Sequence, residues 1–297
     1  MTRTTLRSFL TSLSPLVVSI SLLANSARLA EAGPVFVVVG SDSQSLLTVE
    51  LTGGKAVITG TQTLTPSVGA STFPVITYAD DAANPLNVYA LRNDGAAVID
   101  ADAGDGAWTN GSYGTIASPF TYDDIAYDGG QSQMYATSSG GTSLWRINGP
   151  ASGDQVQVGV FPSGGLFQEI AIDESTGQMY GTDGNGAGLY TINKADASWA
   201  QIAGFTAQGS GTAGSFTDLT FTLDGQLYGM NTTAIYEINK ATAVYNPNFF
   251  PIETSGGTPV TVAGHFAAVP EPSTLALLGC GAVAAVGFAR RRRARTS

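Results

Sequence analysis

The central part of the chain repeats one pattern of short apolar segments. Each copy opens on an acidic residue and an apolar segment, passes a Gly-containing turn to Gln-Met-Tyr or Gln-Leu-Tyr, and closes on an alternating segment ending Ile-Asn. Three copies cover residues 124–148, 169–193 and 218–239. Alternation of apolar and polar residues is typical of half-buried β-strands, so each copy predicts a small antiparallel sheet.

Two weaker copies precede these three, at residues 75–100 and 35–50, and the copy at 35–50 lacks its first strand. Equivalent positions in chain order are Val37, Tyr89, Tyr135, Tyr180 and Tyr228, at spacings of 52, 46, 45 and 48 residues. A period of about 40–50 residues built from short strands is typical of propeller blades. A strand near residues 260–268 would complete the first copy and remove an exposed sheet edge.

We therefore predict an all-β fold in which residues 33–268 form a β-propeller of about five blades. A two-sheet β-sandwich is the alternative, although a sandwich does not require such regular repetition. The aromatic residues that recur at fixed positions in the copies are expected to pack between blades, because large planar side chains fill the wedge between sheets. Stacking of these rings on sugars is the other interpretation.

Residues 1–32 have the features of a secretory signal peptide. Arg3 and Arg7 precede an apolar run at residues 10–23, and small residues around Ala32 provide a cleavage point. Two earlier alanines are alternative cleavage points. The segment predicts export, because the apolar run lacks the polar face of an amphipathic helix.

The C-terminal segment, residues 269–297, combines a Pro-Glu-Pro motif, an apolar run at residues 275–289 and a terminal arginine cluster. These motif residues are Pro270, Glu271, Pro272, Arg290, Arg291, Arg292 and Arg293. A 15-residue helix spans about 22 Å, short of a hydrocarbon core of about 30 Å. The segment therefore predicts a transmembrane helix that inserts with local thinning of the bilayer, with its arginines on the cytoplasmic side.

This three-part arrangement resembles the PEP-CTERM sorting signal of Gram-negative bacteria. The resemblance implies recognition by an exosortase, a membrane transpeptidase-like enzyme, and processing for the cell surface or extracellular matrix. An ordinary single-pass anchor with a proline-rich stalk is the alternative and shares the same topology. The repeated sequence pattern over residues 124–240 resembles that of secreted bacterial propellers, which implies a fold and no particular activity.

Composition and charge restrict the function further. The chain has 297 residues and a formal charge of −10, and residues 33–269 hold 21 acidic and five basic residues, a charge of −16. Such an acidic domain repels anionic surfaces and disfavours binding to nucleic acid. The single cysteine, Cys280, lies in the apolar C-terminal segment, which excludes an intramolecular disulfide and thiol catalysis. The single histidine, His265, lies near the Pro-Glu-Pro motif, and no G-x-S-x-G sequence is present, which disfavours a Ser-His-Asp hydrolase.

Three acidic residues are candidates for metal binding. Asp124, Glu169 and Asp218 open the first strand of three copies, which would bring them to one mouth of a central channel. Carboxylates that converge there repel one another unless a cation intervenes, and Ca²⁺ or another divalent cation prefers such ligands. The alternative is that each carboxylate accepts hydrogen bonds from neighbouring loop amides. The Asp-rich loops at residues 100–106 and 183–188 lack the spacing of a calcium loop and are interpreted as turns.

From these features we predict an exported, non-enzymatic binding or structural propeller at the cell surface or in the extracellular matrix. Its processing partners would be signal peptidase and an exosortase-type enzyme, with at least transient contact with the inner membrane. Its ligand would be an extracellular polysaccharide or a protein, with no cofactor other than a divalent cation. The alternative is a secreted metal-assisted enzyme of the lactonase or lyase type, in which Asp124, Glu169 and Asp218 surround the ion.

Overall fold

Strands and turns account for the part of the chain that the structure, a computed structural model, describes. The described residues are 33–64, 75–78, 86–91, 98–102, 104–105, 107–109, 122–138, 140–148, 155–162 and 165–269. Within these ranges no helix is long and apolar enough to cross a membrane. The predicted signal peptide, the Pro-Glu-Pro motif and the arginine cluster all lie outside them.

Three antiparallel sheets of four strands follow one another along the chain, and each such unit is called a blade here. The first contains β4 (Val75–Tyr78), β5 (Asn87–Leu91), β6 (Val98–Asp102) and β7 (Trp108–Thr109). The second contains β8 (Tyr122–Asp128), β9 (Gln133–Ser138), β10 (Ser143–Ile147) and β11 (Gln155–Val160). The third contains β12 (Phe167–Asp173), β13 (Gln178–Asp183), β14 (Gly188–Ile192) and β15 (Trp199–Gly204). The strands predicted from the copies at residues 75–100, 124–148 and 169–193 are thus present, and each of these copies forms a separate sheet.

The N-terminal blade is completed by a strand from the far end of the sequence. It contains β1 (Val35–Gly40), β2 (Ser45–Thr52), β3 (Lys55–Thr63) and β22 (Val262–Val269). Strand β22 pairs antiparallel with β1, with Val37 opposite Ala267. The closing strand predicted near residues 260–268 is therefore confirmed, and it protects the edge that β1 would otherwise expose.

The remaining blade joins the N-terminal one through an extra strand. It contains β17 (Asp218–Phe221), β18 (Leu227–Met230), β19 (Ala234–Asn239) and β20 (Val244–Tyr245), with β16 (Thr206–Ala207) beside β20. Strand β21 (Phe250–Thr254) pairs antiparallel with β19 and parallel with β3. The sequence pattern did not predict this link, which makes the two blades one continuous ten-stranded sheet.

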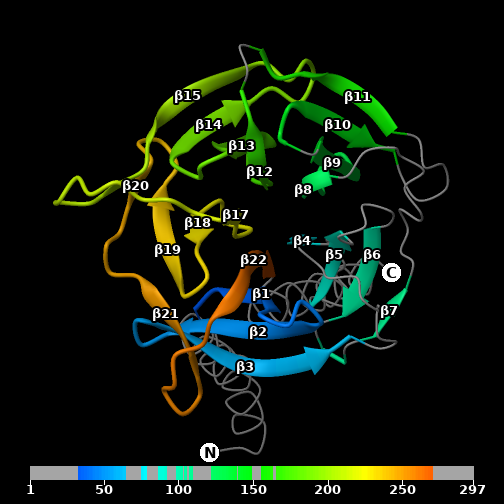
Figure 1. Cartoon of the computed structure of the whole chain (residues 1–297). Helices are drawn as coiled ribbons and strands as arrows, with labels where there is room; N and C mark the ends of the chain where they lie inside the picture. The colour runs from blue at the N-terminus through cyan, green and yellow to red at the C-terminus, as the bar shows by residue number, and fades with distance from the viewer. Residues whose placement is uncertain are drawn as a thin grey trace, which may run out of the picture. The chain divides into compact units, whose positions relative to one another are not determined.

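The inner strands of the blades surround a common centre. Figure 1 shows β4, β8, β12, β17 and β22 around the middle of the ring, and each contacts the next in this order, with β22 returning to β4. Residues 34–270 form one compact unit. The fold class is thus confirmed as an all-β propeller, and the sandwich alternative is wrong. The number of blades stays a prediction, which the five inner strands of the described residues support.

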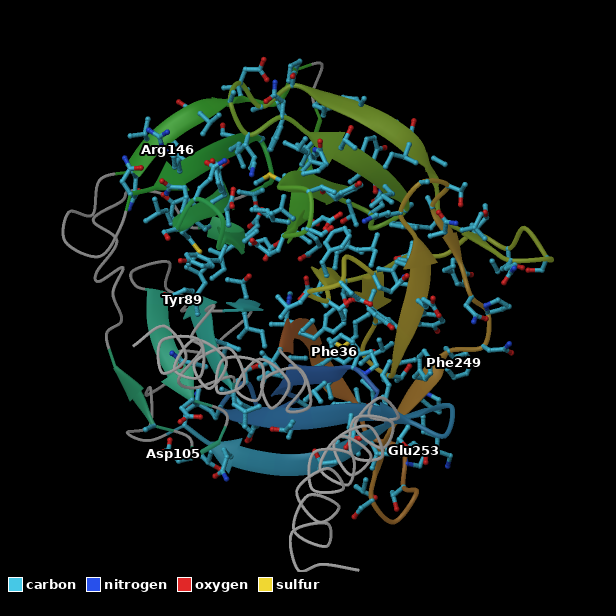
Figure 2. The ribbon with its side chains drawn as sticks, turned by 180° about the vertical axis from the view of Figure 1, so that it is seen from behind. Phe36, Tyr89, Asp105, Arg146, Phe249 and Glu253 are labelled. Carbon is cyan, nitrogen blue, oxygen red and sulfur yellow. The ribbon has the colours of Figure 1, made fainter. Side chains whose placement is uncertain are left out.

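Aromatic side chains fill the space between neighbouring blades, as predicted. The rings of Tyr180 and Phe221 have centroids 5.1 Å apart, and those of Phe36 and Tyr228 are 5.2 Å apart at a steep angle. Each pair joins the second strand of one blade to a strand of the next. Phe36 lies toward the interior of the ring and Phe249 at its outer edge (Figure 2). Packing between blades, which buries large planar side chains, therefore explains why aromatic residues recur in the repeats.

The polar residues of the repeats also have structural roles. In three blades a glutamine donates its side-chain N–H groups to two backbone carbonyls, one on the third strand of its own blade; these are Gln133, Gln178 and Gln226. Lys194 donates to Asp128 and Lys240 to Asp173, so each lysine reaches the end of the inner strand of the preceding blade. These contacts fix the register of the strands and the angle between blades.

Candidate functional site

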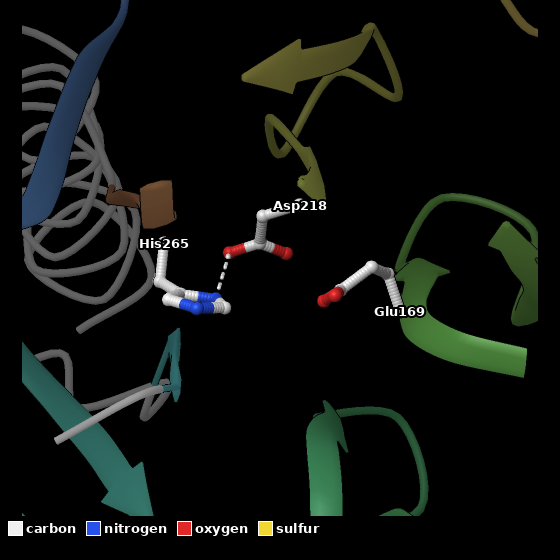
Figure 3. Close-up of side chains that lie close together, drawn as sticks. All are labelled: Glu169, Asp218 and His265. Atoms are coloured by element: carbon white, nitrogen blue, oxygen red, sulfur yellow. Dashed lines mark ion pairs between the residues drawn. The ribbon is translucent and has the colours of Figure 1, made fainter. Parts of the chain in front are cut away.

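The inner strands bring three side chains that could ligate a metal together at one mouth of the ring. Glu169 lies near the start of β12, Asp218 begins β17, and His265 lies in the first half of β22. A nitrogen of the imidazole and one oxygen from each carboxylate all lie within 4.8 Å of one another. Figure 3 shows the three side chains pointing toward one another from three different blades.

Backbone hydrogen bonds show that these residues occupy equivalent positions. Asp124 accepts from the N–H of Ile125, its own neighbour, and from the N–H of Ile170 on the next inner strand. Asp218 does the same with Leu219 at 2.7 Å and Phe266 at 2.8 Å, again on the next inner strand. Since Ile170 follows Glu169 and Phe266 follows His265, the four residues Asp124, Glu169, Asp218 and His265 form one layer of the ring.

The residues of this layer differ in whether their polar atoms have hydrogen-bond partners. Asp124 and Asp218 use both carboxylate oxygens, one for an N–H group of their own strand and one for an N–H group of the next inner strand. Glu169 Oε2 and His265 Nδ1 are buried and have no hydrogen-bond partner among the described residues. His265 Nδ1 lies 3.7 Å from Asp218 Oδ2, which is close enough for an ion pair but too long for a hydrogen bond. Glu169 and His265 therefore have unused binding capacity inside the mouth.

The carboxyl groups of the layer carry unfavourable negative charge. Burial raises the pKa of Glu169 well above its usual value, and the charges of Asp124, Asp218 and Asp123 raise it further. Burial likewise raises the pKa of Asp124 well above its usual value, and the nearby Asp218 adds to this. The pKa of Asp218 is also raised by burial, although His265 and two backbone N–H groups oppose the shift. A cation placed among these groups would relieve both the desolvation and the mutual repulsion.

A cavity of about 310 Å³ opens beside these side chains. Glu169, Thr182, Phe216 and His265 are among the residues that line it. The axis of the ring is much more filled, because a space of only about 40 Å³ remains between apolar side chains of the inner strands. The room for a ligand near the ring axis therefore lies at this mouth and not in a continuous channel.

Of the three predicted metal ligands, the structure brings Glu169 and Asp218 together with His265. Asp124 lies in the same layer, where its two oxygens accept the backbone N–H groups of Ile125 and Ile170, which belong to inner strands and not to loops. Whether the layer binds a metal stays a prediction. His265 was interpreted as part of a closing strand or linker and was not considered as a ligand. Alignment of the segment His-Phe-Ala-Ala-Val with Asp-Leu-Thr-Phe-Thr of the last full repeat gives His265 the position equivalent to Asp218, and this is the signal that identifies it.

The loop at residues 183–188 behaves as the turn that its sequence predicts. Asp183 Oδ1 accepts the backbone N–H of Asn185 at 3.2 Å and of Ala187 at 2.9 Å. This short-range bonding is typical of an Asx turn. In the loop at 100–106, Asp102 accepts from Gly104 in the same way, while residues 103 and 106 lie outside the described ranges.

Comparison with known proteins identifies the C-terminal segment and the fold. Residues 268–293 match the profile of the PEP-CTERM protein-sorting motif. No curated protein sequence matches the chain. The nidogen/laminin complex contains a structure with a TM-score of 0.50 and 16% identity, which covers 75% of this chain and 82% of the other. A catalytically inactive virginiamycin B lyase from Staphylococcus aureus, solved with quinupristin, has a TM-score of 0.40 and 15% identity over 71% of this chain and 68% of its own.

At 16% identity the similarity to the structure from the nidogen/laminin complex shows the fold, a β-propeller, and nothing about activity. The class of protein defined by the fold and the C-terminal motif is a β-propeller that is exported and sorted. The chain carries a PEP-CTERM sorting motif, which implies processing by an exosortase-type enzyme and a protein that is anchored in a membrane and then released.

Proposed function

We propose that this protein is a non-enzymatic binding or structural propeller of the cell surface or extracellular matrix in a Gram-negative bacterium. The observation that carries the proposal is the PEP-CTERM motif at residues 268–293, whose first two residues are the last two of β22, the strand that closes the ring. Because β22 ends at Val269, the residues after Val269 can be removed without loss of any described strand. A stable ring would then be delivered outside the cell.

The charge of the propeller restricts the ligand it would bind. Residues 33–269 have a formal charge of −16, which disfavours anionic polysaccharides and anionic lipid surfaces. Neutral polysaccharides and cationic proteins are the partners that such a surface favours. The lack of a G-x-S-x-G sequence supports a binding role over nucleophilic hydrolysis.

Mass spectrometry of the mature protein from its native host tests this proposal. The expected product starts after a cleavage near Ala32 and lacks Arg290 to Arg293. In a strain without the exosortase-type enzyme, the arginines should be retained and the protein should stay with the membrane. Retention of the arginines in the wild-type host, or the same product in both strains, would contradict processing by this route.

A metal-assisted enzyme of the lactonase or lyase type is the second candidate, and one observation favours it. Glu169, Asp218 and His265 converge beside a cavity of about 310 Å³, which is large enough for a small substrate. Turnover of lactones or polysaccharides by the metal-loaded protein, lost in the Glu169→Gln variant, would support the enzyme. Metal binding without turnover of these substrates would support the binding role.

A further inference from the structure

The side chains at the mouth of the ring combine two oxygen ligands with one nitrogen ligand. We propose that Glu169, Asp218 and His265 together bind one divalent first-row transition-metal ion, of which Zn²⁺ is the representative. The site requires only that the ring be closed, because His265 lies on β22 and the two acids lie on β12 and β17. It is therefore independent of the export and the binding role proposed above.

The spacing of the side chains fits a single ion after a small adjustment. Their ligand atoms lie within 4.8 Å of one another. Ligands at about 2.0–2.2 Å from a tetrahedral Zn²⁺ are about 3.3–3.5 Å apart, so each side chain has to move by about 1 Å. The three residues come from three different inner strands, so this movement is shared among three side chains.

Unpartnered polar atoms mark the same place. Glu169 Oε2 and His265 Nδ1 are buried and have no hydrogen-bond partner among the described residues. Thr182 Oγ1 is also unpartnered within the described part of the chain, its residue is 0% exposed, and it lines the same cavity as Glu169 and His265. Buried polar atoms without partners are uncommon in folded proteins. Three of them around one cavity indicate that a ligand completes their bonding.

No described lysine neutralises the acids at this mouth. Lys194 and Lys240 pair with Asp128 and Asp173, the last residues of β8 and β12. Glu169 lies near the start of β12, so these lysines serve the opposite mouth of the ring. The negative charge around Glu169 is therefore not balanced by a described lysine, which favours binding of a cation from solution.

The combination of an imidazole nitrogen with carboxylate oxygens indicates which kind of metal ion the site would bind. Imidazole nitrogen is a preferred ligand of Zn²⁺ and related transition metals, whereas Ca²⁺ takes six to eight oxygens. Asp124 belongs to the same layer, but it is not among the side chains whose ligand atoms all lie within 4.8 Å of one another. Asp218 also accepts two backbone N–H groups, and its Oδ2 faces His265 at 3.7 Å, which orients the carboxylate toward the site.

Metal titration of the full-length protein tests the proposal. The protein is first dialysed against EDTA, and Zn²⁺ is then titrated by calorimetry, with the stoichiometry checked by elemental analysis. One Zn²⁺ per chain is expected, with weaker binding of Ca²⁺. Glu169→Gln and His265→Gln should each reduce the Zn²⁺ affinity at least about 10-fold. The matched control is Glu174→Gln, which removes a carboxylate just beyond the other end of β12 and should leave the affinity unchanged.

X-ray absorption spectroscopy of the Zn²⁺-loaded wild-type protein provides a test that requires no variant. The expected spectrum contains scattering from one imidazole, with oxygen as the remaining ligands. Absence of stoichiometric Zn²⁺, absence of imidazole scattering, tighter binding of Ca²⁺ than of Zn²⁺, or equal affinities of Glu169→Gln and Glu174→Gln would each overturn the proposal. None of these results would affect the test of C-terminal processing.

Discussion

Removal of Lys240 and removal of Asp173, the two partners of one ion pair, are expected to destabilise the protein to different extents. The Asp173 side chain is 0% exposed, while the Lys240 side chain is 34% exposed, and Lys240 Nζ lies 2.6 Å from Asp173 Oδ2. Lys240→Met leaves a buried carboxylate without its cation. Asp173→Asn leaves an ammonium group that can turn toward water. The lysine variant should therefore be the more destabilised of the two.

The burial and hydrogen bonds of the two side chains determine how much the two variants differ in stability. Removal of one partner of a buried ion pair costs about 3–5 kcal/mol. Lys240→Met should lower the free energy of unfolding by about 3 kcal/mol, the lower end of this range, because Ser175 Oγ still donates a hydrogen bond to Asp173 at 2.6 Å. Asp173→Asn should cost about 1–2 kcal/mol, since the remaining lysine is partly solvated and the asparagine can still accept a hydrogen bond.

The loss of stability caused by Lys240→Met should also depend on pH, and the pKa of Asp173 determines the direction of this dependence. Burial raises the pKa of Asp173, but hydrogen bonds from Lys240, Ser175 and Thr176 outweigh it, so the pKa lies below its usual value. A carboxyl group with a lowered pKa stabilises the folded state above the pKa of the unfolded chain, about 3.9, and this stabilisation is lost as the pH falls through the folded-state pKa. The difference between the wild type and Lys240→Met should therefore shrink below about pH 4.

Urea unfolding at pH 7, followed by tryptophan fluorescence, measures these free energies. The equivalent pair Lys194 and Asp128 in the preceding blades provides an internal repeat, and its variants should follow the same order. A cost of less than about 1 kcal/mol for Lys240→Met, or a larger cost for Asp173→Asn, would refute the reasoning.

Two further predictions concern the packing of the ring. Gly186→Ala should destabilise the protein by more than about 2 kcal/mol in urea unfolding, because the glycine has φ +63° and a Cβ would lie 2.1 Å from the carbonyl oxygen of Phe216. Gly53→Ala is its control, with φ +56° and no atom within 4 Å, and an equal cost would contradict the steric argument. Phe36→Ala should cost about 3–5 kcal/mol in the same assay, because the side chain is fully buried between blades. Phe249→Ala, at a residue that is 48% exposed, should cost much less, and equal losses would show that Phe36 is not a core residue.

The repeats made most of the fold predictable from the sequence. Residues such as Tyr135, Tyr180 and Tyr228 recur because each packs against the following blade, so packing and sequence have the same period. Strand β21 was missed because it belongs to no repeat. Its parallel pairing with β3 joins segments from distant parts of the chain, and local alternation of apolar and polar residues does not predict such a pairing.

The candidate site was only partly predictable for the same reason. Glu169 and Asp218 stand at the same point of two complete repeats, so their convergence follows from the ring. His265 belongs to a blade whose strands come from both ends of the described unit, and its position in the layer is fixed only when β22 pairs with β1. The sequence showed the closing strand, but the register of that strand depends on the closed structure.

Disulfide cross-linking of β1 to β22 tests most directly whether the ring is closed by the strand that carries His265. Val37 and Ala267 are paired residues on these antiparallel strands, and their Cα atoms should be about 4.5–5.5 Å apart, within the range of a disulfide. The full-length Val37→Cys/Ala267→Cys protein, with Cys280→Ser to remove the native thiol, should form an intramolecular disulfide on mild oxidation. A control with Ala263→Cys in place of Ala267→Cys should not form one. An intramolecular cross-link in the first variant alone is the predicted result, whereas free thiols in both variants would contradict the closed ring and the site it assembles.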